Sequence, residues 1–230
     1  MAGRKPQLDP SKRVFLAELV AATNLVAAIQ AVPSSIRPSA TPALHPKYKI
    51  QVVELAFMGV VAAWEEFLEA TLVRYVAGAK TASGYTPIPK YGLASSLAHS
   101  YNVLSGKENF NQGSDYLKVS DPSWVKNKAN FVFSIHPYGC LTTKAAVLNA
   151  ASKIRNRVAH SSNKCKAEFK VVALQFLNLP ANGTLRQSFT AGDLLLAPTT
   201  SNFGMALPGG LDHFGAFAHI YTGLAHAIVP

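Results

Sequence analysis

Three side chains capable of phosphate chemistry follow one another closely in the chain: the guanidinium of Arg155, the amide of Asn156 and the imidazole of His160. They end an apolar, helix-like run that begins at Ala145. Arginine is permanently cationic and binds phosphate through a rigid fork of donors, whereas histidine gains or loses its proton near neutral pH. Together they can hold a phosphodiester and move its protons.

The spacing of this pair limits how it can act. Arg155 and His160 are five residues apart, which places them about 140° apart around an ideal helix and on different faces. A site within one helix is therefore disfavoured, whereas a frayed helix end or a symmetric dimer with a composite centre fits the spacing. The alternative is a solvated basic helix end whose histidine interacts favourably with the helix dipole.

The charge of the chain favours polyanionic partners. Its 230 residues are 49% hydrophobic, enough for one large domain or two small ones. The 22 Lys and Arg residues against 12 Asp and Glu give a formal net charge of +10. A basic surface of this kind attracts nucleic acid first and an anionic membrane second.

Cysteine content and hydropathy predict a soluble cytoplasmic protein. Cys140 and Cys165 fit no metal-binding or redox spacing, and two cysteines are too few for a disulfide scaffold. The polar N-terminus lacks the apolar core of a secretion signal. Acidic and basic residues interrupt the apolar stretch 52–76, so no run reaches the ~18 apolar residues of a membrane span. We expect no membrane association and no metal or other cofactor.

Apolar periodicity predicts an all-α bundle with long connecting loops and few or no strands. Ser11 is a candidate cap for a first helix that ends before Pro33, and Thr142 or Thr143 is a candidate cap for the helix that leads to His160. The other expected helices cover residues 48–77, 93–104, 124–133, 165–179 and 211–229, with a short one at 191–196. Residues 131–135 are an alternative short strand.

One carboxylate lies on the apolar stripe of the longest predicted helix. The stripe consists of Leu55, Met58, Val61, Leu68, Leu72 and Tyr75. Glu65 falls on it, whereas Glu66 and Glu69 point to its flank. Because a buried carboxylate is costly unless it is paired, Glu65 should meet a cation or donor from another helix. The alternative is a glutamate at the helix edge that reaches solvent.

The segment Arg155-Asn156-Arg157-Val158-Ala159-His160 resembles the Arg-x4–6-His signature of the HEPN superfamily (higher eukaryotes and prokaryotes nucleotide-binding). In that signature the residue after the arginine is often polar, as Asn156 is. Two further segments, Trp64-Glu-Glu-Phe-Leu68 and Ala191-Gly-Asp-Leu-Leu195, are similar to segments of bacterial HEPN ribonuclease-like families. The resemblance extends from about residue 52 to the C-terminus.

The resemblance implies one HEPN-like helical domain over residues 1–230. Its N-terminal residues 1–11 are expected to be flexible, residues 32–46 to form a proline-rich loop, and residues 79–122 to be a variable insertion. It also implies dimerisation through the motif helices and metal-independent RNA cleavage. In that reaction a 2′-hydroxyl attacks the adjacent phosphorus and leaves a 2′,3′-cyclic phosphate and a 5′-hydroxyl.

Carried onto this chain, the resemblance makes His160 the general acid or base. Arg155 would stabilise the charge on the phosphorane, and Asn156 would orient the site or donate to phosphate. Glu65 would hold Arg155 in place, unless Glu66 takes that part.

Other candidate residues carry less specific signals. Five basic residues could bind the RNA backbone or simply form a solvated face: Lys153, Arg157, Lys164, Lys166 and Lys170. His219 and His226 lack the further ligands of a metal site, and we interpret His99 and His136 as structural. Ser161 and Ser162 are interpreted as cap or turn residues.

The leading hypothesis is a homodimeric HEPN-type endoribonuclease that acts on cellular RNA as a toxin or antiviral effector, with an antitoxin or regulatory protein as a candidate partner. The alternative is a non-catalytic HEPN-like module that binds RNA or protein. A third hypothesis is a helical scaffold or antitoxin-like inhibitor without a role in nucleic-acid binding.

Overall fold

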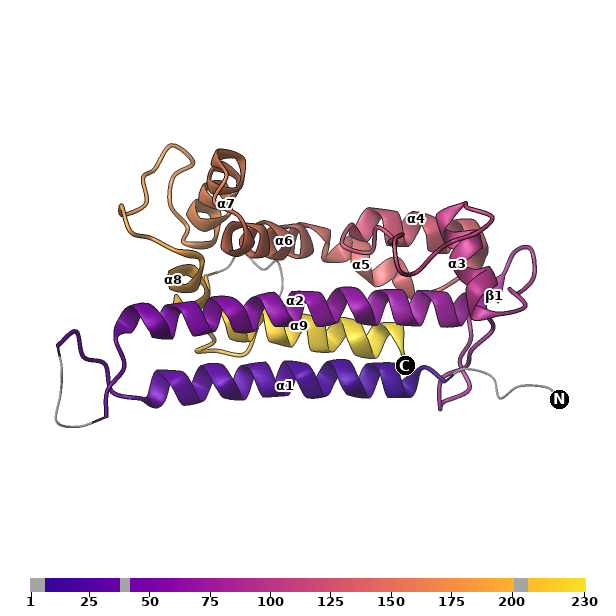
Figure 1. Ribbon diagram of the computed structural model, residues 1–230, viewed down its shortest axis with the longest axis horizontal. Coiled ribbons are helices and arrows are strands. Elements are labelled where there is room, and N and C mark those ends of the chain that lie inside the picture. Colours follow the sequence, from indigo (N-terminus) through magenta and orange to yellow (C-terminus); the bar gives the residue numbers. More distant parts are fainter. Residues whose placement is uncertain (1–6, 38–41, 201–206) are drawn as a thin grey trace. The chain divides into compact units, whose positions relative to one another are not determined.

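The computed structural model describes residues 7–37, 42–200 and 207–230 and shows a mostly helical protein (Figure 1). The strands β1 (Ile88–Pro89) and β2 (Phe133–Ile135) pair antiparallel, with Ile88 opposite Ile135. The all-α prediction is confirmed. The helices are α1 (Asp9–Ala31), α2 (Pro46–Val76), α3 (Leu97–Ser105), α4 (Pro122–Val132), α5 (Cys140–Thr143), α6 (Ala145–Ala159), α7 (Asn163–Phe176), α8 (Ala191–Leu196) and α9 (His213–Ile228), with a 3-10 turn η1 (Pro137–Gly139).

The chain divides into two compact units, each assembled from distant segments. Unit 1 combines Met1–Leu16, Ala63–Asn149 and Thr222–Pro230. Unit 2 combines Ala17–Ala62 and Ala150–Tyr221. The prediction of one domain over residues 1–230 stays a prediction.

An aromatic cluster forms the core of unit 1. The ring of Phe15 lies 5.5 Å from that of Trp64 and 5.2 Å from that of Phe67, and all three side chains are buried. Two buried hydroxyls are satisfied: Tyr75 donates to the carbonyl of Ile228 at 2.7 Å, and Tyr138 donates to Thr71 Oγ1 at 3.1 Å. Burial of these polar groups is therefore compensated by hydrogen bonds. Trp64 and Phe67, quoted above for the family resemblance, are core residues.

Unit 1 also contains an irregular but hydrogen-bonded loop between α3 and α4. Asn102 donates to the carbonyl of Glu108 at 2.5 Å and accepts from the backbone N–H of Phe110 at 3.0 Å. Asp115 accepts from the ammonium of Lys107 at 2.5 Å and from the N–H of Asn111 at 3.0 Å. These bonds, that of Lys107 first, lower the pKa of Asp115. This loop, residues 106–121, belongs to the stretch 79–122 predicted to be a variable insertion and has no helix or strand.

In unit 2 a buried lysine caps the C-terminal end of α1. The Nζ of Lys49 donates to the carbonyls of Gln30, at 3.1 Å, and Val32. These carbonyls lie at the C-terminus of α1, where a cation also complements the helix dipole. One of the chain's cations is therefore used in folding. The proline-rich connection is non-helical in its described residues 32–37 and 42–45, as predicted.

Close packing between α2 and α8 requires glycine at position 192. A Cβ there would lie 2.6 Å from Ile50 Cγ2 and 2.8 Å from the carbonyl oxygen of Ile50. The N–H of Gly192 also donates to Glu54 Oε1 at 3.0 Å. A capping box between Thr190 and Asp193 begins α8. The segment Ala191-Gly-Asp-Leu-Leu195 is thus explained by packing and capping.

Replacing Gly192 by alanine is expected to lower the free energy of unfolding by about 1–3 kcal/mol, because the backbone of α2 must move to admit the methyl group. Urea denaturation followed by circular dichroism measures this change. Gly59 on α2 is the matched control, since a Cβ there meets nothing within 4 Å. Gly59→Ala should raise the stability by up to about 1 kcal/mol through helix propensity. Equal effects of the two changes would contradict the packing argument.

A second prediction concerns the buried His213. Its ring stacks on Phe176, with centroids 5.4 Å apart, and its Nδ1 donates to the carbonyl of Leu194 at 2.9 Å. Burial lowers its pKa below 6.5. As pH falls below about 6.5, the unfolded chain therefore takes up a proton that the folded chain resists, and stability is lost towards the folded-state pKa.

The free energy of unfolding is accordingly expected to fall between pH 7 and pH 5, with His213 contributing at most about 1.4 kcal/mol per pH unit. Urea titrations at several pH values measure the slope. His213→Gln should reduce that slope, even if it also lowers stability at pH 7. A slope unchanged by this substitution would show that His213 does not titrate as its burial requires.

The stripe predicted for α2 is wrong at its N-terminal end. The side chain of Leu55 is 64% exposed and Met58 is half-buried, whereas Val61, Leu68, Leu72 and Tyr75 are buried as expected. The reason is that α2 is apolar around most of its circumference, and its buried positions include Val53, Ala56, Phe57, Val60, Trp64 and Phe67. Periodicity alone then does not select the buried face.

Several predicted helix ends also differ from the structure. Thr142 and Thr143 do not cap the motif helix: they end the separate helix α5, and Thr143 donates to the carbonyl of Cys140. Helix α3 starts at Leu97 after the cap Ser96, four residues later than predicted. Helix α7 ends at Phe176, ahead of Asn178 with its positive φ of 55°.

At the N-terminus, the residues described do not fit the expected flexible segment. Leu8 is fully buried, Gln7 forms a bridge with Lys80, and α1 already begins at Asp9. Residues 1–6 lie outside the described part of the chain.

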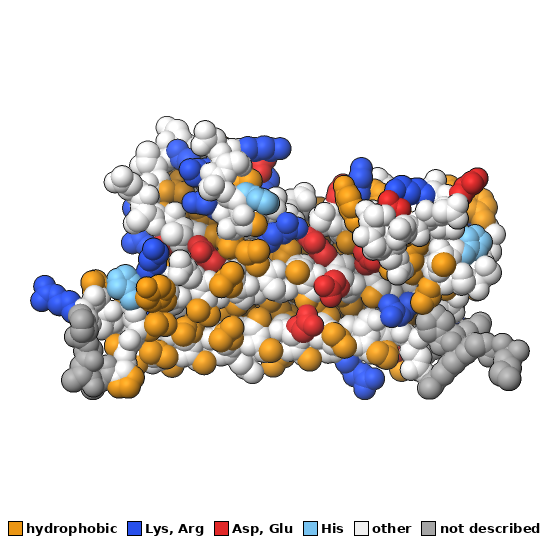
Figure 2. All heavy atoms as spheres, viewed as in Figure 1, with side chains coloured by type: hydrophobic (Ala, Val, Ile, Leu, Met, Phe, Trp, Pro, Cys, Tyr) orange, Lys and Arg blue, Asp and Glu red, His pale blue; other side chains and the backbone are white. Residues whose placement is uncertain are grey.

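Within the described residues, α1 is long and apolar enough to cross a membrane. Its most apolar window of 18 residues has a mean hydropathy of 1.7, and 17% of that window is buried. Figure 2 shows hydrophobic side chains along the exposed surface of α1 and the neighbouring part of α2. A core helix and a signal sequence have the same length and composition, so α1 does not identify an anchor. The absence of membrane association stays a prediction.

Candidate nuclease site

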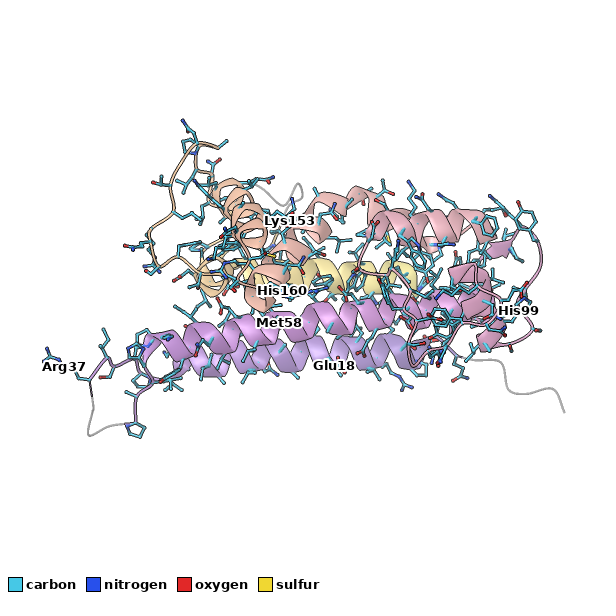
Figure 3. All side chains as sticks on the ribbon, turned by 45° about the horizontal axis from the view of Figure 1, so that its top comes forward. Glu18, Arg37, Met58, His99, Lys153 and His160 are labelled. Carbon is cyan, nitrogen blue, oxygen red and sulfur yellow. The ribbon has the colours of Figure 1, made fainter. Side chains whose placement is uncertain are left out.

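The motif residues lie at the C-terminal end of α6, in unit 2. The backbone N–H of His160 donates to the carbonyl of Asn156 at 2.9 Å, which closes the last turn. Ser162 then caps α7 by accepting from the N–H of Cys165 at 3.3 Å. His160 therefore lies in a tight corner between two helices, and the cap predicted near Ser161 and Ser162 is confirmed. Figure 3 labels His160 and, within α6, Lys153.

Arg155 and His160 belong to different sides of α6. Ala151 and Ile154 are fully buried, and Arg155 follows Ala151 by four residues, so it lies only about 40° from it around the helix. Arg155 is accordingly half-buried and makes an interaction of its own. His160 follows Asn156 by four residues and is exposed. The structure therefore aligns His160 with Asn156, and not with Arg155.

The stretch that carries the motif is cationic over 46 residues. Residues 122–167 contain no Asp or Glu, because Asp121 precedes the stretch and Glu168 follows it. This stretch adds Lys126, Lys128 and Lys144 to the basic residues named above. Its Lys and Arg residues are Lys126, Lys128, Lys144, Lys153, Arg155, Arg157, Lys164 and Lys166. Figure 2 shows Lys and Arg side chains gathered over the α6 and α7 part of unit 2.

The predicted RNA-contacting cations fall into separate groups. Lys153 and Arg157 are four residues apart on α6 and share a face, as do Lys166 and Lys170 on α7. Lys164 approaches Glu168 at 4.0 Å, with its side chain 83% exposed. Such an exposed pair contributes little to stability. Lys166 and Lys170 are exposed on α7 and face solvent.

Three glutamates of α2, Glu65, Glu66 and Glu69, lie in unit 1. Glu65 is half-buried and has an interaction partner, whereas Glu66 is exposed. Glu69 accepts from the hydroxyl of Tyr101 at 2.8 Å. Burial, together with this bond, raises the pKa of Tyr101 to about 12. Because Arg155 belongs to unit 2, the role of Glu65 in holding Arg155 stays a prediction, as does the choice between Glu65 and Glu66.

Other reactive side chains are not arranged for catalysis. Burial raises the pKa of the Cys140 thiol to about 11, so thiolate is scarce at neutral pH. His219 and His226 are exposed on α9. Among the described residues, no three His, Cys, Asp or Glu side chains are grouped so that they could hold a metal ion. The prediction that no cofactor is needed remains a prediction.

Comparison with known proteins gives no relative. No protein-family model matches the chain, and no curated protein and no solved structure matches it. The interpretation of the site therefore depends on the residues and on their chemistry.

Proposed function

We propose that the protein is a metal-independent, HEPN-type endoribonuclease that cuts cellular RNA as a toxin or antiviral effector in the cytoplasm. The observation that carries this proposal is the C-terminal end of α6. There an exposed His160 follows Asn156 by one turn, with Arg155 beside them, in a stretch of 46 residues without a carboxylate. Such a stretch favours approach of the phosphate backbone.

In the proposed reaction the 2′-oxygen of a ribose forms a bond to the adjacent phosphorus while the bond from phosphorus to the 5′-oxygen breaks. The imidazole of His160 takes the proton of the 2′-hydroxyl or supplies one to the departing 5′-oxygen. The guanidinium of Arg155 stabilises the charge on the phosphorane, and the amide of Asn156 donates to a phosphate oxygen. The products are a 2′,3′-cyclic phosphate and a 5′-hydroxyl.

A homodimer is part of the proposal, because Arg155 and His160 lie on different sides of α6. Two copies related by a twofold axis can place Arg155 of one copy near His160 of the other, which a single helix does not do. An antitoxin or regulatory protein that covers this end of α6 would then control the activity.

Incubation of the purified protein with a mixed-sequence RNA in excess EDTA tests the proposal. We expect cleavage to persist in EDTA and the fragments to end in 2′,3′-cyclic phosphate and 5′-hydroxyl groups, because no step needs a metal ion. End mapping with a phosphatase and a kinase distinguishes these termini from 3′-hydroxyl products. Intact RNA, or loss of cleavage in EDTA, would contradict the proposal.

The second candidate is a non-catalytic HEPN-like module that binds RNA or protein. The exposed face formed by Lys166 and Lys170 favours it, because lysines can contact phosphate without any catalytic chemistry. RNA binding that weakens with salt and with Lys166→Ala or Lys170→Ala, without any cleavage, would support this function over the nuclease.

A further inference from the structure

A cluster of exposed aromatic side chains in unit 1 is not used by the proposed chemistry. Tyr91, just after β1, is 79% exposed, and Phe131 of α4 is 56% exposed. Their ring centroids lie 5.9 Å apart with planes inclined at 47°. Contiguous exposed apolar side chains mark interaction sites more often than isolated ones do. We call this feature, with Trp124 and Lys128 of α4, the Tyr91–Phe131 surface.

Helix α4 extends this surface with a third ring. Trp124, Lys128 and Phe131 are spaced at intervals of four and three residues and so share one side of α4. The ammonium of Lys128 lies 5.7 Å from the centroid of the Trp124 ring, a distance suited to a cation–π interaction. The surface thus alternates aromatic faces with a cation.

A hollow of about 160 Å³ lies beside the two exposed rings. Its lining includes Tyr91, Leu93, His99, Val103 and Phe131. The Nδ1 of His99 contacts the hydroxyl of Ser95 at 3.1 Å, so Nε2 is the ring nitrogen available to a ligand. Figure 3 labels His99 at the edge of unit 1. An apolar hollow with aromatic walls and one polar ring fits a flat heterocycle better than an aliphatic side chain.

The two segments that form the surface carry cations and no carboxylate of their own. Residues 80–107 and 122–136 contain no Asp or Glu. The Nζ of Lys90 donates to the carbonyl of Asn130 at 2.6 Å, which holds it beside the last turn of α4 with two N–H donors still available. Burial lowers the pKa of His136, and the positive charges of Lys126 and Lys90 lower it further. Lys90, Lys126 and Lys128 on these segments favour an anionic partner.

We propose that the Tyr91–Phe131 surface binds single-stranded RNA, with one base stacked against Tyr91 and Phe131 at the hollow and the adjoining phosphates on Lys90 and Lys128. Aromatic rings interleaved with cations are the arrangement by which proteins bind unpaired strands. A duplex keeps its bases stacked inside and gains nothing from these rings. The inference rests on the proposed action on RNA and adds a surface, remote in sequence from His160, that selects unpaired strands.

Fluorescence anisotropy with the intact wild-type protein tests this inference. The probe is a fluorescein-labelled 2′-O-methyl oligouridylate of about twelve nucleotides, which binds like RNA but lacks the 2′-hydroxyl needed for cleavage. We expect Tyr91→Ala and Phe131→Ala to weaken binding roughly tenfold each and Tyr91→Phe to retain it, because the loss of a stacked base is what is measured. A matched duplex probe should bind more weakly than the single strand.

Tyr116 is the matched control, since its side chain is 80% exposed in the same unit. Tyr116→Ala should bind the probe as the wild type does. Equal affinities of wild type, Tyr91→Ala and Phe131→Ala would overturn the inference, as would preference for the duplex. A shift from dimer to monomer in light scattering, with unchanged affinity, would instead identify the surface as a contact between two copies. Cleavage is measured in a separate assay. A protein that binds the probe through Tyr91 but leaves RNA intact would contradict the nuclease proposal and support the binding surface.

Discussion

Replacing His160 by alanine is expected to lower the rate of RNA cleavage by about 10²–10⁴-fold, which is the usual contribution of a general acid or base. The substitution should leave the stability of the fold nearly unchanged. His160 is exposed and follows the last residue of α6, and its bond to Asn156 uses only the backbone. The measurement is the initial rate of release of fragments with cyclic phosphate ends.

His219→Ala provides the control, because it removes another exposed imidazole from unit 2. It should cleave RNA at the wild-type rate. Binding of the uncleavable probe should be preserved in His160→Ala, which separates loss of chemistry from loss of affinity. If His160→Ala and the wild type cleave equally fast, the activity belongs to a different site or to a contaminating nuclease.

The helices that could be predicted from the sequence are those with strong local signals. The helical spacing of apolar residues, together with the prolines at positions 33 and 180, locates α1, α7 and α9 to within a few residues. The break at Lys144 between α5 and α6 has no such signal, because Thr142, Thr143 and Lys144 are all compatible with a helix. At the break, Lys144 has a non-helical backbone conformation, with φ −115° and ψ 7°.

The candidate site could be predicted only in part for a similar reason. The positions of Arg155, Asn156 and His160 around α6 follow from helix geometry. The structure agrees with the angle of about 140° between Arg155 and His160 that their spacing predicts. The pairing of Tyr91 with Phe131 joins residues 40 positions apart. No local pattern specifies such a contact, which requires the β1–β2 pairing that brings the end of β1 next to α4.

The second large effect is expected when two inactive variants are combined. Arg155→Ala should lower cleavage by roughly 10²–10³-fold through the loss of charge stabilisation, and His160→Ala should be inactive as described above. If Arg155 of one copy serves His160 of the other, a mixed dimer of the two variants has one site with both residues lost and one site that is fully wild type. Mixed dimers make up about half of a random mixture, so roughly a quarter of the wild-type activity should return.

Co-expression of the two variants with different affinity tags, followed by purification on both tags in sequence, isolates the mixed dimer. Its specific activity should approach half that of the wild type, because one of its two sites is intact. The control is the mixed dimer of two Arg155→Ala chains, which should stay inactive. If each site instead used Arg155 and His160 of the same chain, the mixed dimer would contain no intact site and would show no recovery. Either that result or a strictly monomeric protein in light scattering would contradict a composite site that joins Arg155 of one copy to His160 of the other.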